Sequence, residues 1–250
     1  MENEKNETVV SQPSETRRQM SPSTAIIIAG AMISLAVLAG GYFRSTGTLS
    51  GSPKVALVSA PEYKVKATDI PNLKNWRIGP ADAPVVITEF TDTECPFCKK
   101  SHTIIHEVLD HYAGKVALVY KHFPLESLHS YARNEAKALE CAGSIGGNVA
   151  FWNFADTVFV NTQSNDGLDP SLLPAIAKKI GLNEKKFSEC LANNKFDEKI
   201  DADLKEGESL GVQGTPFFVI EKDGKQIATI PGAYPADTFY KKIDPLLQAQ

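Results

Sequence analysis

Net charge and cysteine are both scarce in this sequence, and each shortage excludes a class of protein. The formal net charge of the 250-residue chain is −4, so the chain lacks the basic excess that is typical of a nucleic-acid binder. Four cysteines are too few for a miniprotein built on disulfides, but enough for one redox or metal site plus one disulfide. Apolar residues make up 42% and charged residues 22%, which excludes a disordered chain, a coiled coil and a collagen-like fibre.

The N-terminal part divides into a polar tail and an apolar run. Residues 1–23 are predicted to be a disordered cytoplasmic tail, because their polar composition cannot bury a core. Residues 24–43 carry no charge, and their length matches one bilayer crossing as a helix. Arg17 and Arg18 precede the run and only Arg44 directly follows it. The positive-inside rule therefore predicts a single-pass membrane protein whose remaining chain is extracytoplasmic, in the periplasm or at the outer surface.

Two other interpretations of the apolar run stay open. Val37-x-Ala39 can serve as the cleavage site of a signal peptide, although the run is longer than a usual signal core. A buried helix of a soluble domain is the third interpretation. The anchor and the signal both export the rest of the chain, so disulfides are permitted there.

A tether and then a βαβ unit follow. Residues 44–73 are punctuated by Ser, Gly, Pro and Lys, and we expect a tether with one short strand near 55–58. Residues 85–90 (VVITEF) form an apolar, β-branched run that is typical of a strand buried on both faces. Apolar residues with helical spacing continue to Gly114, and a second strand is predicted at 116–122. This pattern predicts a βαβ unit with parallel strands.

A helical block separates this unit from the last strands. Asp223-Gly224 is a strong hairpin signal between two late strands. The predicted α/β domain comprises residues 74–126 and 211–250, with an all-helical insertion at 127–210. The helices and late strands are separated by Gly, Asn and Pro; the helices are expected at 128–142, 148–161, 170–180, 184–192, 195–210 and 236–247, and the strands at 216–221 and 226–230.

Cys95-Pro96-Phe97-Cys98 carries the chemistry. Proline is favoured at the first helical position, which makes Cys95 the N-cap. Its sulfur can then accept hydrogen bonds from the amides of Phe97 and Cys98, and it lies at the positive end of the helix dipole. Both effects favour the thiolate, which is the nucleophile. We therefore expect Cys95 to attack and Cys98, one turn into the helix, to resolve.

A zinc site is one alternative for this motif, and a purely structural disulfide is another. Cys98, His102 and His106 fall at i, i+4 and i+8, which imitates ligand spacing. However, there is no second CxxC, and His106 would lie about 12 Å from Cys98 along one helix face. We therefore expect no metal, and we expect His102 and His106 to be solvated or packing residues.

The region from Asn75 to Leu247 resembles the DsbA family of thiol-disulfide oxidoreductases, which have a thioredoxin fold with an inserted helical domain. CxxC alone is weak evidence, but its combination with a helical insertion and a late Gly-Thr-Pro before a strand is specific. The expected fold class is thus α/β, thioredoxin-like, with an all-helical insertion and a preceding transmembrane helix. The residues that carry the resemblance are Gly79–Val85, Glu89-Phe90, Cys95–Cys98, Lys121–Leu125 and Gly211–Pro216.

The resemblance implies roles for three further residues. Pro216 matches a cis-proline that lies beside the catalytic cysteine and helps the backbone of Thr215 pair with a substrate peptide. Glu89 matches a buried acid that takes the proton of the resolving cysteine, directly or through water. A solvent-facing Glu89 is the alternative; burial would instead raise its pKa.

One departure from the family affects the expected redox potential. Strongly oxidising members carry His between the cysteines, whereas Pro96 and Phe97 stand here and Glu94 precedes Cys95. Phe97 cannot stabilise a thiolate, and a nearby acid opposes ionisation. We therefore expect these residues to moderate the potential, within the range of about −120 to −270 mV. Phe97 could instead offer an apolar surface to unfolded substrates.

Cys141 and Cys190 are expected to form a structural disulfide. In an exported protein this is the simplest fate of the pair, and it is the pairing that leaves the CxxC motif free. Some relatives carry a comparable bridge. Two unpaired buried cysteines are the alternative.

The resemblance implies a dithiol oxidase that introduces disulfides into secreted or envelope proteins without a cofactor. Its expected partners are unfolded exported polypeptides with free thiols and a quinone-linked membrane protein that reoxidises the pair. An isomerase or reductase of the same fold is one alternative, although residues 45–73 are too short and polar for a dimerisation domain. A non-catalytic binding or chaperone module is the other.

Overall fold

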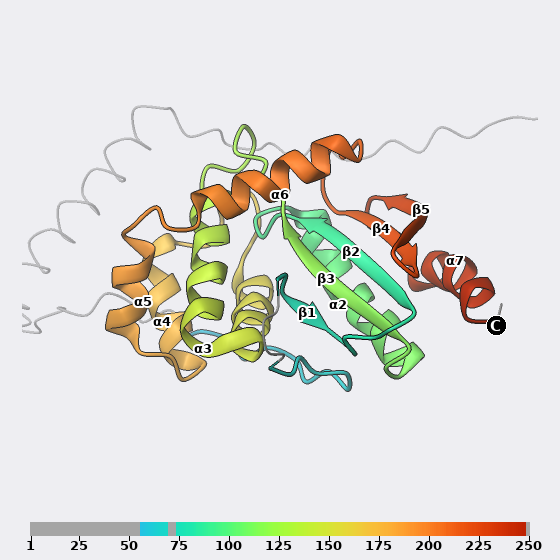
Figure 1. Cartoon of the computed structure of the whole chain (residues 1–250). Coiled ribbons are helices and arrows are strands. Elements are labelled where there is room, and N and C mark those ends of the chain that lie inside the picture. The colour runs from blue at the N-terminus through green and yellow to red at the C-terminus, as the bar shows by residue number, and fades with distance from the viewer. Residues whose placement is uncertain (1–55, 70–73, 249–250) are drawn as a thin grey trace, which may run out of the picture. The chain divides into compact units, whose positions relative to one another are not determined.

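A five-stranded mixed sheet forms the centre of the computed structural model, which describes residues 56–69 and 74–248 (Figure 1). The strand order is β1-β3-β2-β4-β5; β2 and β3 are parallel, and every other neighbouring pair is antiparallel. The predicted parallel βαβ unit and both late strands are confirmed, whereas the two-residue β1 was not expected. The strands are β1 (Arg77–Ile78), β2 (Val85–Thr91), β3 (Val116–His122), β4 (Phe217–Lys222) and β5 (Lys225–Pro231).

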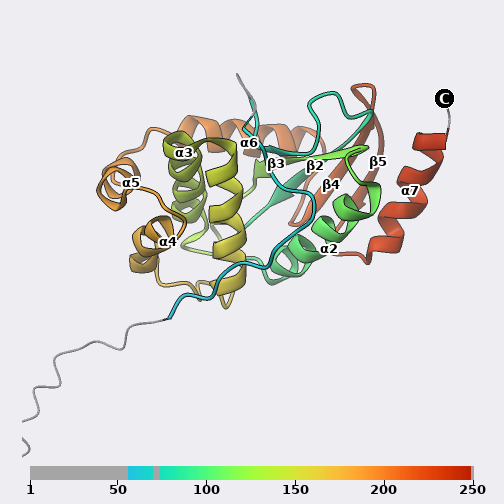
Figure 2. The ribbon, with the colours of Figure 1, turned by 90° about the horizontal axis from the view of Figure 1, so that it is seen from below.

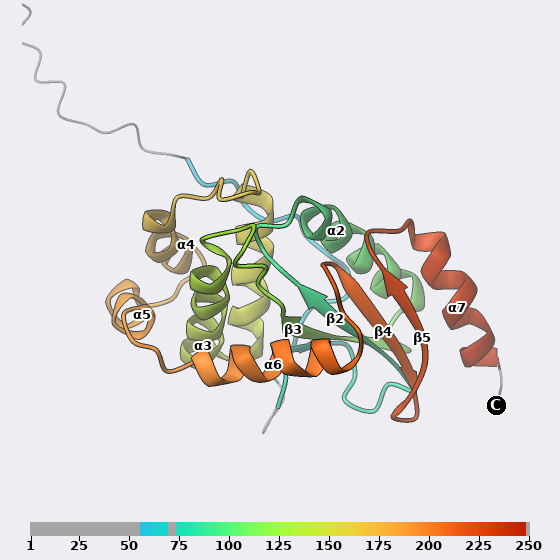
Figure 3. The same ribbon diagram turned by 90° about the horizontal axis from the view of Figure 1, so that it is seen from above.

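Helices cover both faces of this sheet. Figures 2 and 3 show α2 (Pro96–Tyr112) and α7 (Ala236–Gln248) on one face and α6 (Asp197–Ser209) on the other. Because successive strand residues point to opposite faces, β2 contributes to two cores. Ile87 belongs to the larger core beneath α2 and α7, and Phe90 belongs to a smaller core on the α6 side.

Residues with left-handed backbone conformation lie at a turn and at a helix break, where the sequence predicts them. Asp223 and Gly224 have φ of 50° and 74°, which is the backbone of the predicted tight hairpin between β4 and β5. Gly147 has φ 80° and ψ −170°, and it breaks α3 (Ala132–Asn161) into the two helical parts that the sequence separates. The first part begins at Ala132 rather than at residue 128. A Cβ at Gly147 would lie 2.5 Å from Oδ1 of Asp69, so that side chain would have to move, and the positive φ itself favours glycine.

The remaining helices of the block gather with α3 at one end of the sheet (Figure 1). They are α4 (Leu173–Lys179), preceded by a 3₁₀ turn at Pro170–Leu172, and α5 (Glu184–Leu191). Both follow the predicted segments closely. Together with α3 they pack into the larger core, which also contains the residues of β2 and β3 beneath α2.

The segment before β1 differs from the expected tether and strand. The predicted strand near 55–58 is wrong for residues 56–58, which have no strand partner. The amide of Val58 donates to Oδ1 of Asn161 (2.7 Å) on α3, and the amide of Val65 donates to Oδ1 of Asp110 (2.7 Å) on α2. Residues 56–69 therefore lie along α2 and α3 and are held there by side chains, as Figure 2 also shows.

The predicted cytoplasmic tail, the apolar run at 24–43 and the start of the tether lie outside the described residues. Among residues 56–69 and 74–248, no helix combines the length and the apolarity needed to cross a bilayer.

Candidate active site

The junction between β2 and α2 places the two cysteines of the CxxC motif at the start of a helix. Cys95 is the N-cap, with extended backbone angles (φ −76°, ψ 123°), and Pro96 opens the helix as predicted. The amide of Lys99 donates to the carbonyl of Cys95 (3.0 Å), which closes the first turn. The sulfur of Cys95 makes no cap hydrogen bond of regular geometry, but the amides of Phe97 and Cys98 act on it as expected.

The two thiols are free and differ strongly in acidity. A hydrogen bond from the thiol of Cys98 is the main cause that lowers the pKa of Cys95 to about 6, against the raising effect of burial. The Thr215 side chain and the nearby helix amides lower it further. Complete burial, together with the neighbouring Cys95, raises the pKa of Cys98 well above its ordinary value. This asymmetry favours a thiolate at Cys95 and a protonated thiol at Cys98.

The Thr215–Pro216 peptide bond is cis and lies directly against this pair. In its thiol form Cys95 donates to the carbonyl oxygen of Thr215 across 3.4 Å, although the two residues are 120 positions apart in sequence. The loop between α6 and β4 therefore brings Thr215 and Pro216 to the nucleophile, at the place that the family resemblance implied. Binding of a substrate backbone by Thr215 remains a prediction.

Glu89 is buried and lies on the same side of the sheet as α2. Glu89 is 1% exposed, and the hydroxyl of Ser101 on α2 donates to its Oε1 (3.4 Å). The solvent-facing alternative is therefore wrong. Burial raises the pKa of Glu89 to about 7, despite the opposing charge of His102 and the Ser101 hydrogen bond. An acid with such a pKa can exchange protons near neutral pH.

We expect Glu89→Gln to slow the release of the mixed disulfide and to remove one ionisation from its pH profile. Cys98 has a raised pKa and needs a base before it attacks. The wild-type rate should rise as the pH passes through about 7, because the carboxylate form of Glu89 becomes populated. The variant should lose this inflection and react about 10²-fold more slowly at pH 8. Stopped-flow decay of a peptide–enzyme mixed disulfide between pH 5 and pH 9 measures both effects.

Glu221→Gln is the matched control for that experiment. Glu221 pairs in register with Val86 on β2, and successive strand residues alternate, so it lies on the sheet face opposite Glu89. Its substitution should leave the profile unchanged. An intact inflection near pH 7 in Glu89→Gln would assign the proton transfer to another group.

Glu94, the acid expected to oppose ionisation of Cys95, is bonded to the loop after α3. It is fully buried; its carboxylate accepts from the hydroxyl of Thr162 (3.3 Å) and from the amide of Gly167 (3.0 Å). Burial, followed by the neighbouring Glu94 carboxyl, raises the pKa of Glu135 to about 10. Glu135 is therefore protonated beside Glu94. The hydrogen bonds of Glu94 connect the active-site loop to the loop after α3.

His129, which the sequence pattern does not indicate, is electrostatically coupled to Cys95. Nδ1 of His129 lies 2.8 Å from Oδ2 of Asp92, and both residues are buried. Burial lowers the pKa of His129, but the hydrogen bond and charge of Asp92 and the charge of Cys95 outweigh it, so the net shift is upward. The charges of His129 and Cys95 are therefore coupled, and this coupling favours the protonated imidazole. No local spacing reveals it, because the contact depends on the loop before α3.

The remaining predicted residues lie where their proposed roles allow. Phe97 is 63% exposed beside the buried thiols, so its ring is available at the surface. Cys141 of α3 and Cys190 of α5 form a disulfide across a sequence separation of 49; the alternative of two unpaired cysteines is wrong.

His102 and His106 are both buried rather than solvated. Nε2 of His102 lies 2.8 Å from Oδ1 of Asp156 on α3, and Nε2 of His106 lies 3.4 Å from the same oxygen. Cys98 does not join them, so the arrangement of Cys98, His102 and His106 that was considered as a zinc site is not formed.

The fold corresponds to that of thiol-disulfide oxidoreductases of the DsbA type. The chain is similar to DsbA2 from Pseudomonas aeruginosa, with 29% identity, 70% of this chain and 95% of that chain covered, and a TM-score of 0.59. BdbD from Bacillus subtilis in its oxidised form shares the fold at 21% identity, with 77% and 100% covered and a TM-score of 0.62. The resemblance to this family is confirmed.

The model of the thioredoxin family matches residues 72–235, so the chain belongs to the thioredoxin family. Among curated proteins it is 34% identical over 142 residues to Na(+)/H(+) antiporter NhaA 3 of Salinispora tropica, which covers 57% of this chain but 21% of that protein. The chain therefore spans about a fifth of that relative's length, and the antiport in its name belongs to a protein with much additional sequence.

Proposed function

We propose that this protein is an exported enzyme that introduces disulfide bonds into secreted or envelope proteins through Cys95 and Cys98. The observation that carries the proposal is the opposite shift of the two thiols: the pKa of Cys95 is lowered to about 6 and that of Cys98 is raised. A low pKa makes Cys95 a good leaving group, and it stabilises the reduced enzyme. Stabilising the reduced form makes the disulfide form a stronger oxidant.

The reaction balances as two thiol–disulfide exchanges. A substrate thiolate attacks the sulfur of Cys95 in the oxidised enzyme; the Cys95–Cys98 bond breaks, and Cys98 leaves as a thiolate that takes a proton. A second substrate thiolate then attacks the substrate sulfur of the mixed disulfide and expels Cys95 as a thiolate. The substrate loses two electrons and becomes a disulfide, while the enzyme becomes a dithiol. Glu89 exchanges the proton with Cys98, and the backbone of Thr215 pairs with the substrate chain.

Reoxidation closes the cycle. A quinone-linked membrane protein accepts the two electrons of the Cys95–Cys98 dithiol, which requires that the catalytic domain reach a membrane. We propose that residues 24–43 anchor the chain with its C-terminal domain outside the cytoplasm. Retention of the full-length protein in the pellet after an alkaline carbonate wash supports the anchor, whereas a soluble form that begins near Gly40 contradicts it.

The direction of the reaction is tested with a reduced, multi-cysteine secreted protein. The oxidised enzyme should remove free thiols from this client rapidly, and the reduced enzyme should melt at a higher temperature than the oxidised enzyme. Cys95→Ala is the control: in its presence the client should lose free thiols only at the uncatalysed rate. An oxidised form that is more stable than the dithiol, with insulin reduction as the faster activity, would instead assign a reductase or isomerase. Folding assistance that survives in Cys95→Ala would assign a chaperone.

A further inference from the structure

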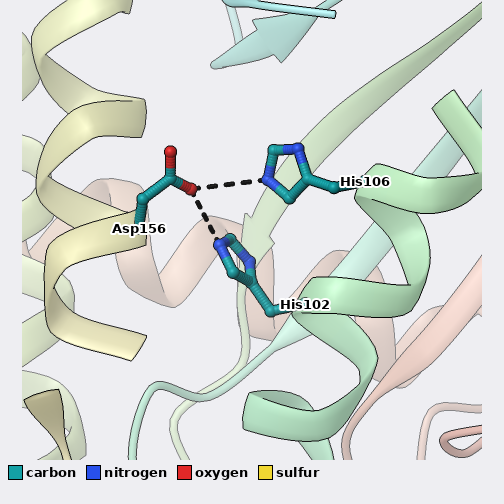
Figure 4. A group of neighbouring side chains, drawn as sticks. All are labelled: His102, His106 and Asp156. Carbon is teal, nitrogen blue, oxygen red and sulfur yellow. Dashed lines mark hydrogen bonds and ion pairs between the residues drawn. The ribbon is translucent and has the colours of Figure 1, made fainter. Parts of the chain in front are cut away.

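Two imidazoles and a carboxylate, which are common metal ligands, lie close together about one helical turn beyond Cys98. His102 and His106 lie at i and i+4 on α2, so they share one helix face, and Asp156 faces them from α3 (Figure 4). One ligand atom from each residue lies within 4.8 Å of the others. The side chains of His102, His106 and Asp156 are 5%, 2% and 12% exposed, so the cluster is almost entirely removed from solvent.

The hydrogen bonding of this cluster is incomplete. A single oxygen, Oδ1 of Asp156, faces Nε2 of both histidines, at 2.8 Å for His102 and 3.4 Å for His106. Nδ1 of His106 has no hydrogen-bond partner among the described residues, and Nε2 has only this long contact with Asp156, which lacks hydrogen-bond geometry. A buried polar group without a partner destabilises a fold, so a ligand that accepts the lone pair of His106 would satisfy the group.

Aromatic rings stack on both imidazoles, and a cavity reaches the cluster from solvent. The ring of Tyr63 stacks on His106 at 3.5 Å between centroids and 6° between planes, and Phe159 stacks on His102 at 4.3 Å. A cavity of about 460 Å³ reaches His106 and Asp156 between residues 59–67 and α3. A small hydrated ion can therefore approach the carboxylate and one imidazole from this cavity.

We propose that His102, His106 and Asp156 bind one divalent transition-metal ion, with Zn²⁺ as the expected occupant. Two imidazoles and a carboxylate suit Zn²⁺, whereas Ca²⁺ and Mg²⁺ prefer sites made of oxygen. A tetrahedral Zn²⁺ spaces its ligand atoms about 3.3 Å apart, which small rotations of the two imidazoles supply. The ion would join α2, which carries the active-site cysteines, to α3 of the helical block. Its fourth position would face the cavity and hold a water molecule.

The test uses the untagged full-length protein in detergent, with Cys95 and Cys98 oxidised to a disulfide so that no thiolate competes for metal. Titration calorimetry with Zn²⁺ should give one equivalent. Co²⁺ should give visible d–d bands without a sulfur-to-cobalt charge-transfer band. Asp156→Asn keeps the size of the side chain and should weaken Zn²⁺ binding at least about tenfold. His106→Gln should weaken it at least as much.

His111→Gln is the matched control, because His111 is an exposed histidine on the same helix; it should bind Zn²⁺ like the wild type. Absence of Co²⁺ bands and of Zn²⁺ binding in the oxidised wild type would overturn the proposal and leave the cluster as an ion pair only. This arm uses no variant, so it does not depend on the folding of a mutant. Equal Zn²⁺ affinity of wild type and folded Asp156→Asn would also overturn it.

Discussion

Cys98→Ser is expected to accumulate a stable disulfide between Cys95 and a substrate peptide, whereas Cys95→Ala should form none. With a pKa of about 6, Cys95 is about 90% thiolate at pH 7, compared with about 1% for a thiol whose pKa is 9. Only Cys95 can therefore react quickly, and within the enzyme only Cys98 can release the adduct. Non-reducing gels and mass spectrometry of each variant, incubated with a peptide that carries an activated disulfide, measure the adduct.

Serine and alanine at position 98 should differ in how fast they trap the adduct. The hydrogen bond from Cys98 is the largest cause of the lowered pKa of Cys95, and a serine hydroxyl retains a donor that alanine lacks. Cys98→Ala should therefore also trap the adduct, but more slowly at pH 6 to 7, because the pKa of Cys95 rises. Equal trapping by Cys95→Ala and Cys98→Ser would show that the roles are assigned wrongly.

Removal of the Cys141–Cys190 disulfide should strongly lower the free energy of unfolding but leave thiol oxidation intact. The bond closes a loop with a sequence separation of 49, for which the chain-entropy model gives about 4 kcal/mol. For a domain of this size we expect the Tm of the double alanine variant to fall by about 8–16 °C. Thiol oxidation should persist below that Tm, because the bond joins α3 to α5, and neither helix carries Cys95, Cys98 or Pro216.

Calorimetric melting and the client-oxidation assay on the same sample measure both parts of this prediction. Ser188→Ala is the matched control, since Ser188 is an exposed residue of α5 and surface changes usually stay within about 0.5 kcal/mol. A folded double variant that no longer oxidises its client would give the bond a role in the reaction. An unchanged Tm would mean that the loop is constrained equally well by packing alone.

The sequence by itself determined the elements and residues that depend on near neighbours. The β-branched run of β2, proline after Cys95 and the Asp223-Gly224 turn each act over a few residues, so their structures follow from local sterics and hydrophobic spacing. The likeness of Cys95–Cys98 and Gly214-Thr215-Pro216 to a known family then indicated which distant segments would meet. The sequence does not predict β1, because two residues carry no periodicity, and it predicts a free tether at residues 56–69, because the contacts of this segment are made by single side chains.

Only the tertiary structure decided the environment of the thiols and the histidines. His129 reaches Asp92 across 37 positions, and Asp156 reaches His102 across 54. Both contacts depend on how the helical block packs against α2 and the sheet, which no local pattern specifies. The acidity of Glu89 likewise depends on complete burial, since desolvation is set by everything packed around a group and not by its sequence neighbours.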